Sequence, residues 1–294
     1  MTNIYEILIK SDKPISEFDD DLLFTYKVLS ISQYTMNGES YFNLLFDQKN
    51  ISIIKKIVSS LFDSPLDFQI KKVENKNWVL ENQKSLKPLI ISGLYIHNDS
   101  YQKDKYKKIN ICINEGQAFG TGHHGTTLGC INALLDLQKN IKVKSFLDIG
   151  TGSGLLSIVA NKIWKCKGIS IDNDKKSIDV SRNNFNKNNC KNEVTLRVLD
   201  ITKEPYKMKN SAQFDLIIIN ILANVVDQIK HDVARLVTKN GILVLSGFTE
   251  YHKSKIRIKY QNLGFTLVKE YVREGWITLV LKASCIQPQT RYPC

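Results

Sequence analysis

The chain has 294 residues, of which 43% are hydrophobic and 24% charged, the balance of a globular protein with one large domain and a small one. No apolar run approaches the roughly 18 residues that cross a membrane, which argues against a membrane-spanning protein. Lysine and arginine outnumber the acidic residues by 41 to 29, for a formal net charge of +12. This excess favours acidic partners such as nucleic acid or the ribosome, although lysines spread along a chain are also typical of a solvated surface.

Six cysteines occur and none forms a Cys-x-x-Cys pair, so neither a zinc site nor a thioredoxin-like motif is indicated. The N-terminal residues lack the basic stretch and apolar core of a secretion leader. We therefore expect a cytoplasmic protein whose cysteines stay reduced.

The first 73 residues, 1–73, predict a small α/β domain with the order βαββαβ, which is the ferredoxin-like pattern. Asn37-Gly38 is a strong hairpin signal between the two middle strands. The expected strands are 4–9, a segment opening at Ile31, 41–46 and 66–73, and the expected helices are 15–29 and 51–62.

A linker is predicted at 74–88, with a short helix at 78–86. Strands at 89–96 and 109–113, separated by a lysine-rich loop, open the second domain, which we assign to 89–294.

From residue 144 onward, apolar strands alternate with helices, which predicts a parallel sheet covered on both faces. The expected strands are 145–149, 168–171, 194–199, 214–219 and 241–245, followed by a closing pair at 265–271 and 276–281. The expected helices are 155–164, 175–187, 223–237 and 253–263. The closing pair favours a Rossmann-like, seven-stranded sheet of the methyltransferase type over a symmetric dinucleotide-binding fold.

A glycine motif, Asp148-Ile149-Gly150-Thr151-Gly152-Ser153-Gly154, lies between a predicted strand and a predicted helix. Its glycines allow a tight turn and a close approach of the backbone to a ligand. A dinucleotide fingerprint places the third glycine at i+5, where this chain has Leu155. The shorter form indicates S-adenosylmethionine, whose amino-acid end would face the helix start, with Asp148 meeting the ammonium directly or through water.

Three polar residues end the next predicted strands. Asp172 can accept both ribose hydroxyls, since it occupies the position where dinucleotide folds carry that acid, or it could cap the following helix, which is the role expected for Asp174. Asp200 could lie beside the adenine or simply end its strand. Asn220 could accept a hydrogen bond from an amine nucleophile, or it could cap the following helix. The first role resembles that of the N/D-P-P-Y signature of amino-group methyltransferases, although this chain lacks the prolines and the tyrosine of that signature.

The segment 118–127, Ala-Phe-Gly-Thr-Gly-His-His-Gly-Thr-Thr, precedes an apolar helix. Its glycines and threonines indicate a flexible loop and a hydroxyl-rich helix start that could close over a cofactor, with Phe119 on one side and Thr127 toward the carboxylate. His123 and His124 have no acidic or cysteine partner at metal-ligand spacing, so no metal site is expected.

These segments resemble the ribosomal protein L11 methyltransferase family of bacteria, in the loop at 118–127, the glycine loop at 148–154 and the strand end Ile219-Asn220-Ile221-Leu222. The resemblance implies a class I, S-adenosylmethionine-dependent protein N-methyltransferase whose cofactor-binding positions are Thr127, Gly150, Asp172 and Asn220. It also implies that domain 1–73 recognises L11 and that lysine side chains and the N-terminal amine are methylated. We expect no dedicated general base, no metal, no need for nucleic acid and a monomer.

The chain departs from the family at Gly125, where many members have proline, and in its tail, 284–294. We expect the glycine to loosen the loop before the helix. Three other functions stay open: methylation of RNA or another protein, such as an electron-transfer flavoprotein, nicotinamide-dependent oxidoreduction, and non-catalytic ribosome binding.

Overall fold

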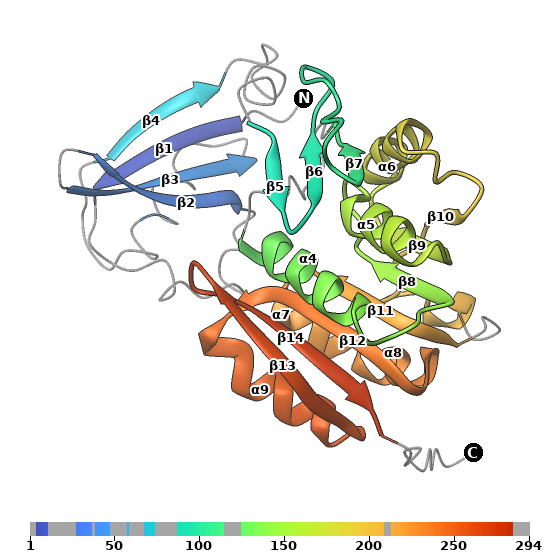
Figure 1. The fold of residues 1–294 in the computed structure, drawn as a ribbon. Coiled ribbons are helices and arrows are strands. Elements are labelled where there is room, and N and C mark those ends of the chain that lie inside the picture. Colours follow the sequence, from blue (N-terminus) through green and yellow to red (C-terminus); the bar gives the residue numbers. More distant parts are fainter. Residues whose placement is uncertain are drawn as a thin grey trace. The chain divides into compact units, whose positions relative to one another are not determined.

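The computed structural model describes residues 4–10, 28–36, 39–47, 58, 68–73, 87–114, 125–208 and 213–284 (Figure 1). The chain divides into two compact units, Met1–Trp78 and Val79–Cys294, and each is described by itself. Among the described helices, none is long and apolar enough to cross a membrane.

The first unit contains an antiparallel sheet with the strand order β2-β3-β1-β4. Its strands are β1 (Ile4–Lys10), β2 (Val28–Met36), β3 (Glu39–Asp47) and β4 (Phe68–Val73). Tyr5, Ile7 and Ile9 alternate along β1 and are buried, which is the period of a strand with one covered face. This order agrees with the predicted ferredoxin-like pattern. The turn at 37–38 and most of the two predicted helices lie outside the described residues.

The second unit begins with a small sheet made of β5 (Leu89–Ile91), β6 (Leu94–His97) and β7 (Ile109–Cys112). β5 and β6 are antiparallel, and β6 and β7 are parallel. The single strand predicted at 89–96 is therefore wrong. The chain reverses at Ser92 and Gly93, whose φ angles are 42° and 93°.

The main sheet has seven strands in the order β10-β9-β8-β11-β12-β14-β13. The first five of this order are parallel, and β14 is antiparallel to both neighbours. The strands are β8 (Ser145–Ile149), β9 (Lys167–Asp172), β10 (Val194–Val198), β11 (Phe214–Asn220), β12 (Val237–Thr249), β13 (Phe265–Arg273) and β14 (Trp276–Ala283). The chain starts at β8 and moves outward to β10, then returns to β11, so the sheet has its topological switch point between β8 and β11.

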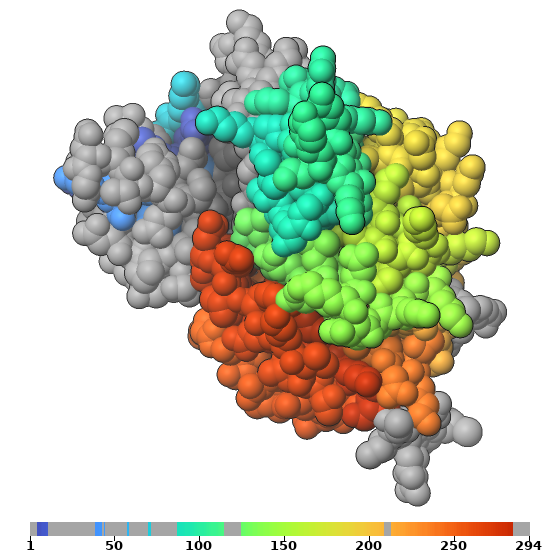
Figure 2. Space-filling model, viewed as in Figure 1, coloured from blue at the N-terminus to red at the C-terminus, as the bar shows by residue number. Residues whose placement is uncertain are grey.

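Helices cover both faces of this sheet (Figure 1). One face carries α4 (Gly125–Gln138), α5 (Leu155–Trp164) and α6 (Lys175–Lys187), and the other carries α7 (Ala223–Gln228), α8 (Lys230–Leu236) and α9 (Glu250–Gln261). A short 3-10 turn, η2 (Pro205–Met208), precedes β11. In the space-filling view, α4 lies directly against the β13–β14 hairpin (Figure 2).

Two predicted boundaries were wrong. The helix predicted at 223–237 is two helices separated at Ile229, and its last predicted residue, Val237, instead pairs with Phe214 as the start of β12. Consequently, β12 is much longer than the strand predicted at 241–245.

Alternate residues of the parallel strands enter two separate cores. On β11, Leu216 and Ile218 pack with α4 and α5, whereas Ile217 and Ile219 pack with α7 to α9. All four are fully buried. A strand that is apolar on both faces is what a parallel sheet between two helix layers requires.

Gly168 of β9 has no room for a side chain, because a Cβ there would lie 2.2 Å from the ring of Phe146 on β8. We expect Gly168→Ala to lower the free energy of unfolding by about 1–3 kcal/mol through overpacking, measured by urea denaturation. The double variant with Phe146→Leu should recover part of the loss. Equal stability of Gly168→Ala and the wild type would contradict this packing.

Candidate active site

The loop between β8 and α5 turns at Gly150, whose φ of 74° favours glycine. A Cβ at this position would also lie 2.3 Å from the side chain of Ile221, which follows β11. The Gly150 and Thr151 N–H groups donate to the Ile171 carbonyl over 2.9 and 3.1 Å, so the loop is joined to β9. The loop therefore lies at the carboxyl edge of the sheet, at the switch point, where open α/β sheets bind ligands.

Asp148 lies under this loop and is only 1% exposed. Its Oδ2 accepts hydrogen bonds from Thr151 Oγ1 at 2.8 Å and from Ser157 Oγ at 2.5 Å, and Ser157 Oγ is 2.7 Å from Ser170 Oγ. Burial raises the pKa of the Asp148 carboxyl to about 6, against the effect of the two hydroxyls. Asp148 thus fixes the loop to α5, and its contact with a cofactor ammonium stays a prediction.

The two peptides that flank Gly152 are both held by side chains. The Gly152 N–H donates to Asp172 Oδ2 over 2.9 Å, and its carbonyl accepts from Ser181 Oγ of α6 over 2.7 Å. The next carbonyl, of Ser153, accepts from Asn184 Nδ2 over 2.8 Å. Gly154 follows with a φ of 82°, and a Cβ there would lie 2.6 Å from the ring of Phe185.

Asp172 ends β9 as predicted and is half-buried. Its Oδ1 accepts from the Asp174 N–H over 2.9 Å, while burial raises the pKa of its carboxyl. The cap of α6 is Asp174, which accepts from the N–H groups of Lys176 and Ser177 at 3.0 and 3.3 Å, so that prediction is confirmed. Asp172 does not cap the helix, and its carboxylate oxygens keep lone pairs for further donors.

Asp200, the candidate beside the adenine, bonds within its own turn. Its Oδ1 accepts from the Thr202 N–H and hydroxyl at 3.0 and 2.6 Å, and its Oδ2 pairs with Lys203 at 3.0 Å. The Thr202 hydroxyl and Lys203 lower the pKa of the Asp200 carboxyl. These contacts explain Asp200 without a ligand, and its role beside the adenine stays a prediction.

On the other side of the switch point, the structure brings Thr127 and Asn220 together. Asn220 Nδ2 donates to Thr127 Oγ1 over 3.4 Å. The other atom of this side-chain amide, Oδ1, is a hydrogen-bond acceptor. Thr127 belongs to the first turn of α4 and is 2% exposed. Residues 115–124, including Phe119 and both neighbouring histidines, lie outside the described residues. In the part that is described, no group of three or more metal-ligating side chains comes together.

Ser181 and Asn184 bond the backbone of the glycine loop, and the sequence analysis did not single them out. They belong to a buried polar stripe along α6 that continues to its C-cap residue, at positions i, i+4, i+7 and i+11: Ser177, Ser181, Asn184 and Asn188. An amphipathic helix normally places apolar residues at this spacing. Buried polar side chains require hydrogen-bond partners, so the stripe could have indicated that a backbone segment packs against α6 and bonds to these side chains.

The sheet order, the glycine loop at the switch point and the acid ending β9 define a class I methyltransferase. A crystal structure of ribosomal protein L11 methylase from Lactobacillus delbrueckii subsp. bulgaricus shares this fold, with a TM-score of 0.57 and 22% identity over 66% of this chain and 96% of that one. Residues 8–284 match the family model for ribosomal protein L11 methyltransferase (PrmA), and the chain belongs to this family.

Curated relatives agree with this assignment. The chain is 30% identical to the ribosomal protein L11 methyltransferase of Campylobacter lari, over 96% of this chain and 98% of the relative. It is 34% identical to the protein of the same name from Nitratiruptor sp., over 76% of this chain and 75% of the relative. The family resemblance inferred from the motifs is therefore confirmed.

The buried Asp148 predicts a pH-dependent difference in stability between the wild type and Asp148→Asn. Its carboxyl pKa rises from 3.8 to about 6 on folding, so the native state binds more protons between these values. The wild type should therefore lose on the order of 3 kcal/mol relative to Asp148→Asn as the pH rises from about 4 to 7. Urea midpoints of both proteins across this range measure the difference, and a constant difference would refute the buried-carboxyl assignment.

Proposed function

We propose that the protein transfers methyl groups from S-adenosylmethionine to amino groups of ribosomal protein L11, on lysine side chains and the N-terminal amine. Family membership supports the activity. The observation that carries the site is the position of the Gly152 peptide, held beside the half-buried Asp172 at the carboxyl edge of the sheet. Thr127 and Asn220 meet across the switch point from it.

The residues present fit this cofactor. Asp172 ends β9 with a half-buried carboxylate that can accept from a ribose hydroxyl, and the loop carries no side chain at Gly150, Gly152 or Gly154. S-adenosylmethionine, when bound, supplies a methyl group on a positively charged sulfur. Thr127 would lie toward the amino-acid end of the cofactor, beside Asn220.

Asn220 would orient the acceptor amine. Its carbonyl oxygen can accept a hydrogen bond from the amine, since its amide nitrogen already donates to Thr127. A lysine amine must be neutral to react, and its ordinary pKa near 10.4 falls on desolvation and beside a positive charge. The rate would then come from proximity and orientation rather than from a dedicated base.

The first unit, Met1–Trp78, would recognise the ribosomal protein. We assign this role to domain 1–73, with 74–88 as a linker to the methyltransferase domain, 89–294. The protein would work in the cytoplasm as a monomer and would not require nucleic acid.

A nicotinamide-dependent oxidoreductase is the alternative from another class. The third glycine of the loop occupies i+4, and Gly154 packs against the Phe185 ring. This spacing differs from the dinucleotide fingerprint, so we favour the methyl donor. Calorimetric titration with S-adenosylhomocysteine and with NAD compares the two cofactors directly.

The activity test is incubation with a radiolabelled methyl donor and either purified L11, other ribosomal proteins or ribosomal RNA. We expect label on L11, stable to base treatment as an N-methyl group is. Label on RNA alone, or on another protein alone, would show that L11 is not the substrate. No label on any of them would contradict the proposed methyltransferase activity.

Asp172→Ala should weaken S-adenosylhomocysteine binding by about 10- to 100-fold, the worth of hydrogen bonds to a charged group. The matched control is Asp174→Ala, which removes the cap of α6 and costs about 1 kcal/mol of stability without touching the proposed ribose site. Calorimetry gives both affinities. Equal losses in the two variants would show that Asp172 acts only through folding.

A further inference from the structure

The side-chain amide of Asn184 bonds two backbone segments that are far apart in the chain. One is the Ser153 carbonyl of the glycine loop, 2.8 Å from Asn184 Nδ2. The other is Asn114, which follows β7: its carbonyl accepts from Nδ2 over 2.9 Å, and its N–H donates to Oδ1 over 2.9 Å. Asn184 is fully buried, and both hydrogens of its Nδ2 are used.

One helical turn later, Asn188 repeats this arrangement with Cys112. Its Oδ1 accepts from the Cys112 N–H over 3.0 Å, and its Nδ2 donates to the Cys112 carbonyl over 2.7 Å. Four helix residues rise about 6 Å, close to the rise of two extended residues. The two side-chain amides can therefore pair with the N–H and carbonyl groups of residues 112 and 114, as the backbone of a neighbouring strand would.

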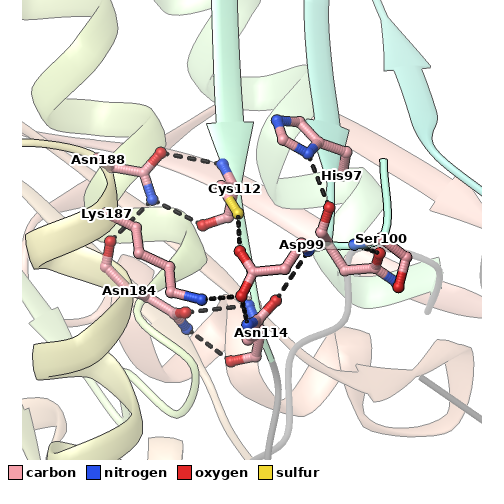
Figure 3. Close-up of polar contacts among 9 residues, drawn as sticks. His97, Asp99, Ser100, Cys112, Asn114, Asn184, Lys187 and Asn188 are labelled. Atoms are coloured by element: carbon pink, nitrogen blue, oxygen red, sulfur yellow. Dashed lines mark hydrogen bonds and ion pairs between the residues drawn. The ribbon is translucent and has the colours of Figure 1, made fainter. Parts of the chain in front are cut away.

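A polar cluster around Asp99 strengthens this docking (Figure 3). Asp99 pairs with Lys187 of α6, and Cys112 Sγ donates to Asp99 Oδ1 over 3.1 Å. The hydrogen bond from Lys187 lowers the pKa of the Asp99 carboxyl to about 2, whereas burial raises the pKa of the Cys112 thiol to about 12. A thiol that stays protonated is a poor nucleophile, so we assign Cys112 a structural role. The cluster holds the segment that leaves β7 against α6.

The two asparagines differ in one contact. The second hydrogen of Asn184 Nδ2 reaches the glycine loop at Ser153, whereas that of Asn188 reaches only the Asn184 carbonyl, within α6, over 2.8 Å. Asn184 therefore joins the segment leaving β7 to the loop at which the cofactor is proposed to bind.

We propose that Asn184 is a positioning residue of the cofactor site, which fixes the Ser153 peptide of the glycine loop against the segment that leaves β7. The inference rests on the proposed function, since it takes the glycine loop to be the cofactor loop. Asn184 touches no reacting atom, and it acts by holding a peptide whose neighbour, Gly152, bonds to Asp172.

Asn184→Asp replaces the donor Nδ2 by an acceptor oxygen that faces the carbonyls of Ser153 and Asn114. Asn188→Asp does the same to the carbonyls of Cys112 and Asn184, and so provides a control of equal chemistry at the C-cap of the same helix. We expect both variants to lose similar thermal stability. The affinity for S-adenosylhomocysteine should fall at least tenfold in Asn184→Asp and less than threefold in Asn188→Asp.

Kinetics with L11 provide a readout that lost stability alone does not change. In Asn184→Asp the KM for S-adenosylmethionine should rise while the KM for L11 stays unchanged. If either aspartate variant does not fold, the alanine pair, Asn184→Ala and Asn188→Ala, takes its place with the same expectations.

Equal affinity losses in the two variants, or no loss in Asn184→Asp, would overturn the positioning role while leaving the proposed function intact. A wild-type protein that does not bind S-adenosylhomocysteine would instead reject the cofactor assignment, and the inference with it. Titration of the wild type therefore separates the two failures before any variant is compared.

Discussion

The hydrogen bonds to the N–H and the carbonyl of Gly152 are the constraint on which the site depends. A glycine-rich loop has no side chains with which to hold itself, and glycine loses more conformational freedom on folding than any other residue. Here the loop takes its shape from its surroundings, because Asp172 of β9 accepts from the Gly152 N–H and Ser181 of α6 donates to the Gly152 carbonyl, so both peptides that flank this glycine are held. Asp172 thus shapes the loop and is also the residue proposed to bind the ribose.

Holding a loop in this way requires buried polar groups, and burying them is unfavourable unless they are paired. Ser181 and Asn184 meet this condition, since their polar atoms bond to backbone carbonyl and N–H groups. Asp148 meets it less well: the hydroxyls of Thr151 and Ser157 bond to it, but burial still raises the pKa of its carboxyl. The Asp148 carboxylate, which fixes the loop to α5, therefore lowers the stability of the protein at neutral pH. Such a loss of stability is common at functional sites.

The sequence predicted the elements that carry strong local signals. The α/β alternation predicted most of the strands and helices around the glycine loop, and the position of Asp172 at the end of β9 was predicted as well. Long-range pairing was not predictable in the same way: Val237 continues an apolar helical pattern, yet it pairs with Phe214 as a strand. The partners of Asn184 were also hidden, because a polar stripe shows that buried bonds exist and not which backbone segment makes them.

Gly125 lets the start of α4 pack closely against the β13–β14 hairpin. It is the first residue of α4, and a Cβ there would lie 2.7 Å from the Arg273 carbonyl of β13. One turn further, a Cβ at Gly129 would lie 2.2 Å from Thr278 Oγ1 of β14. The helix therefore lies closer to the β13–β14 hairpin than any side chain at these positions would permit. Because Thr127 lies between the two glycines, its approach to Asn220 depends on this close packing, and a proline at 125 would require the helix start to move away from the hairpin.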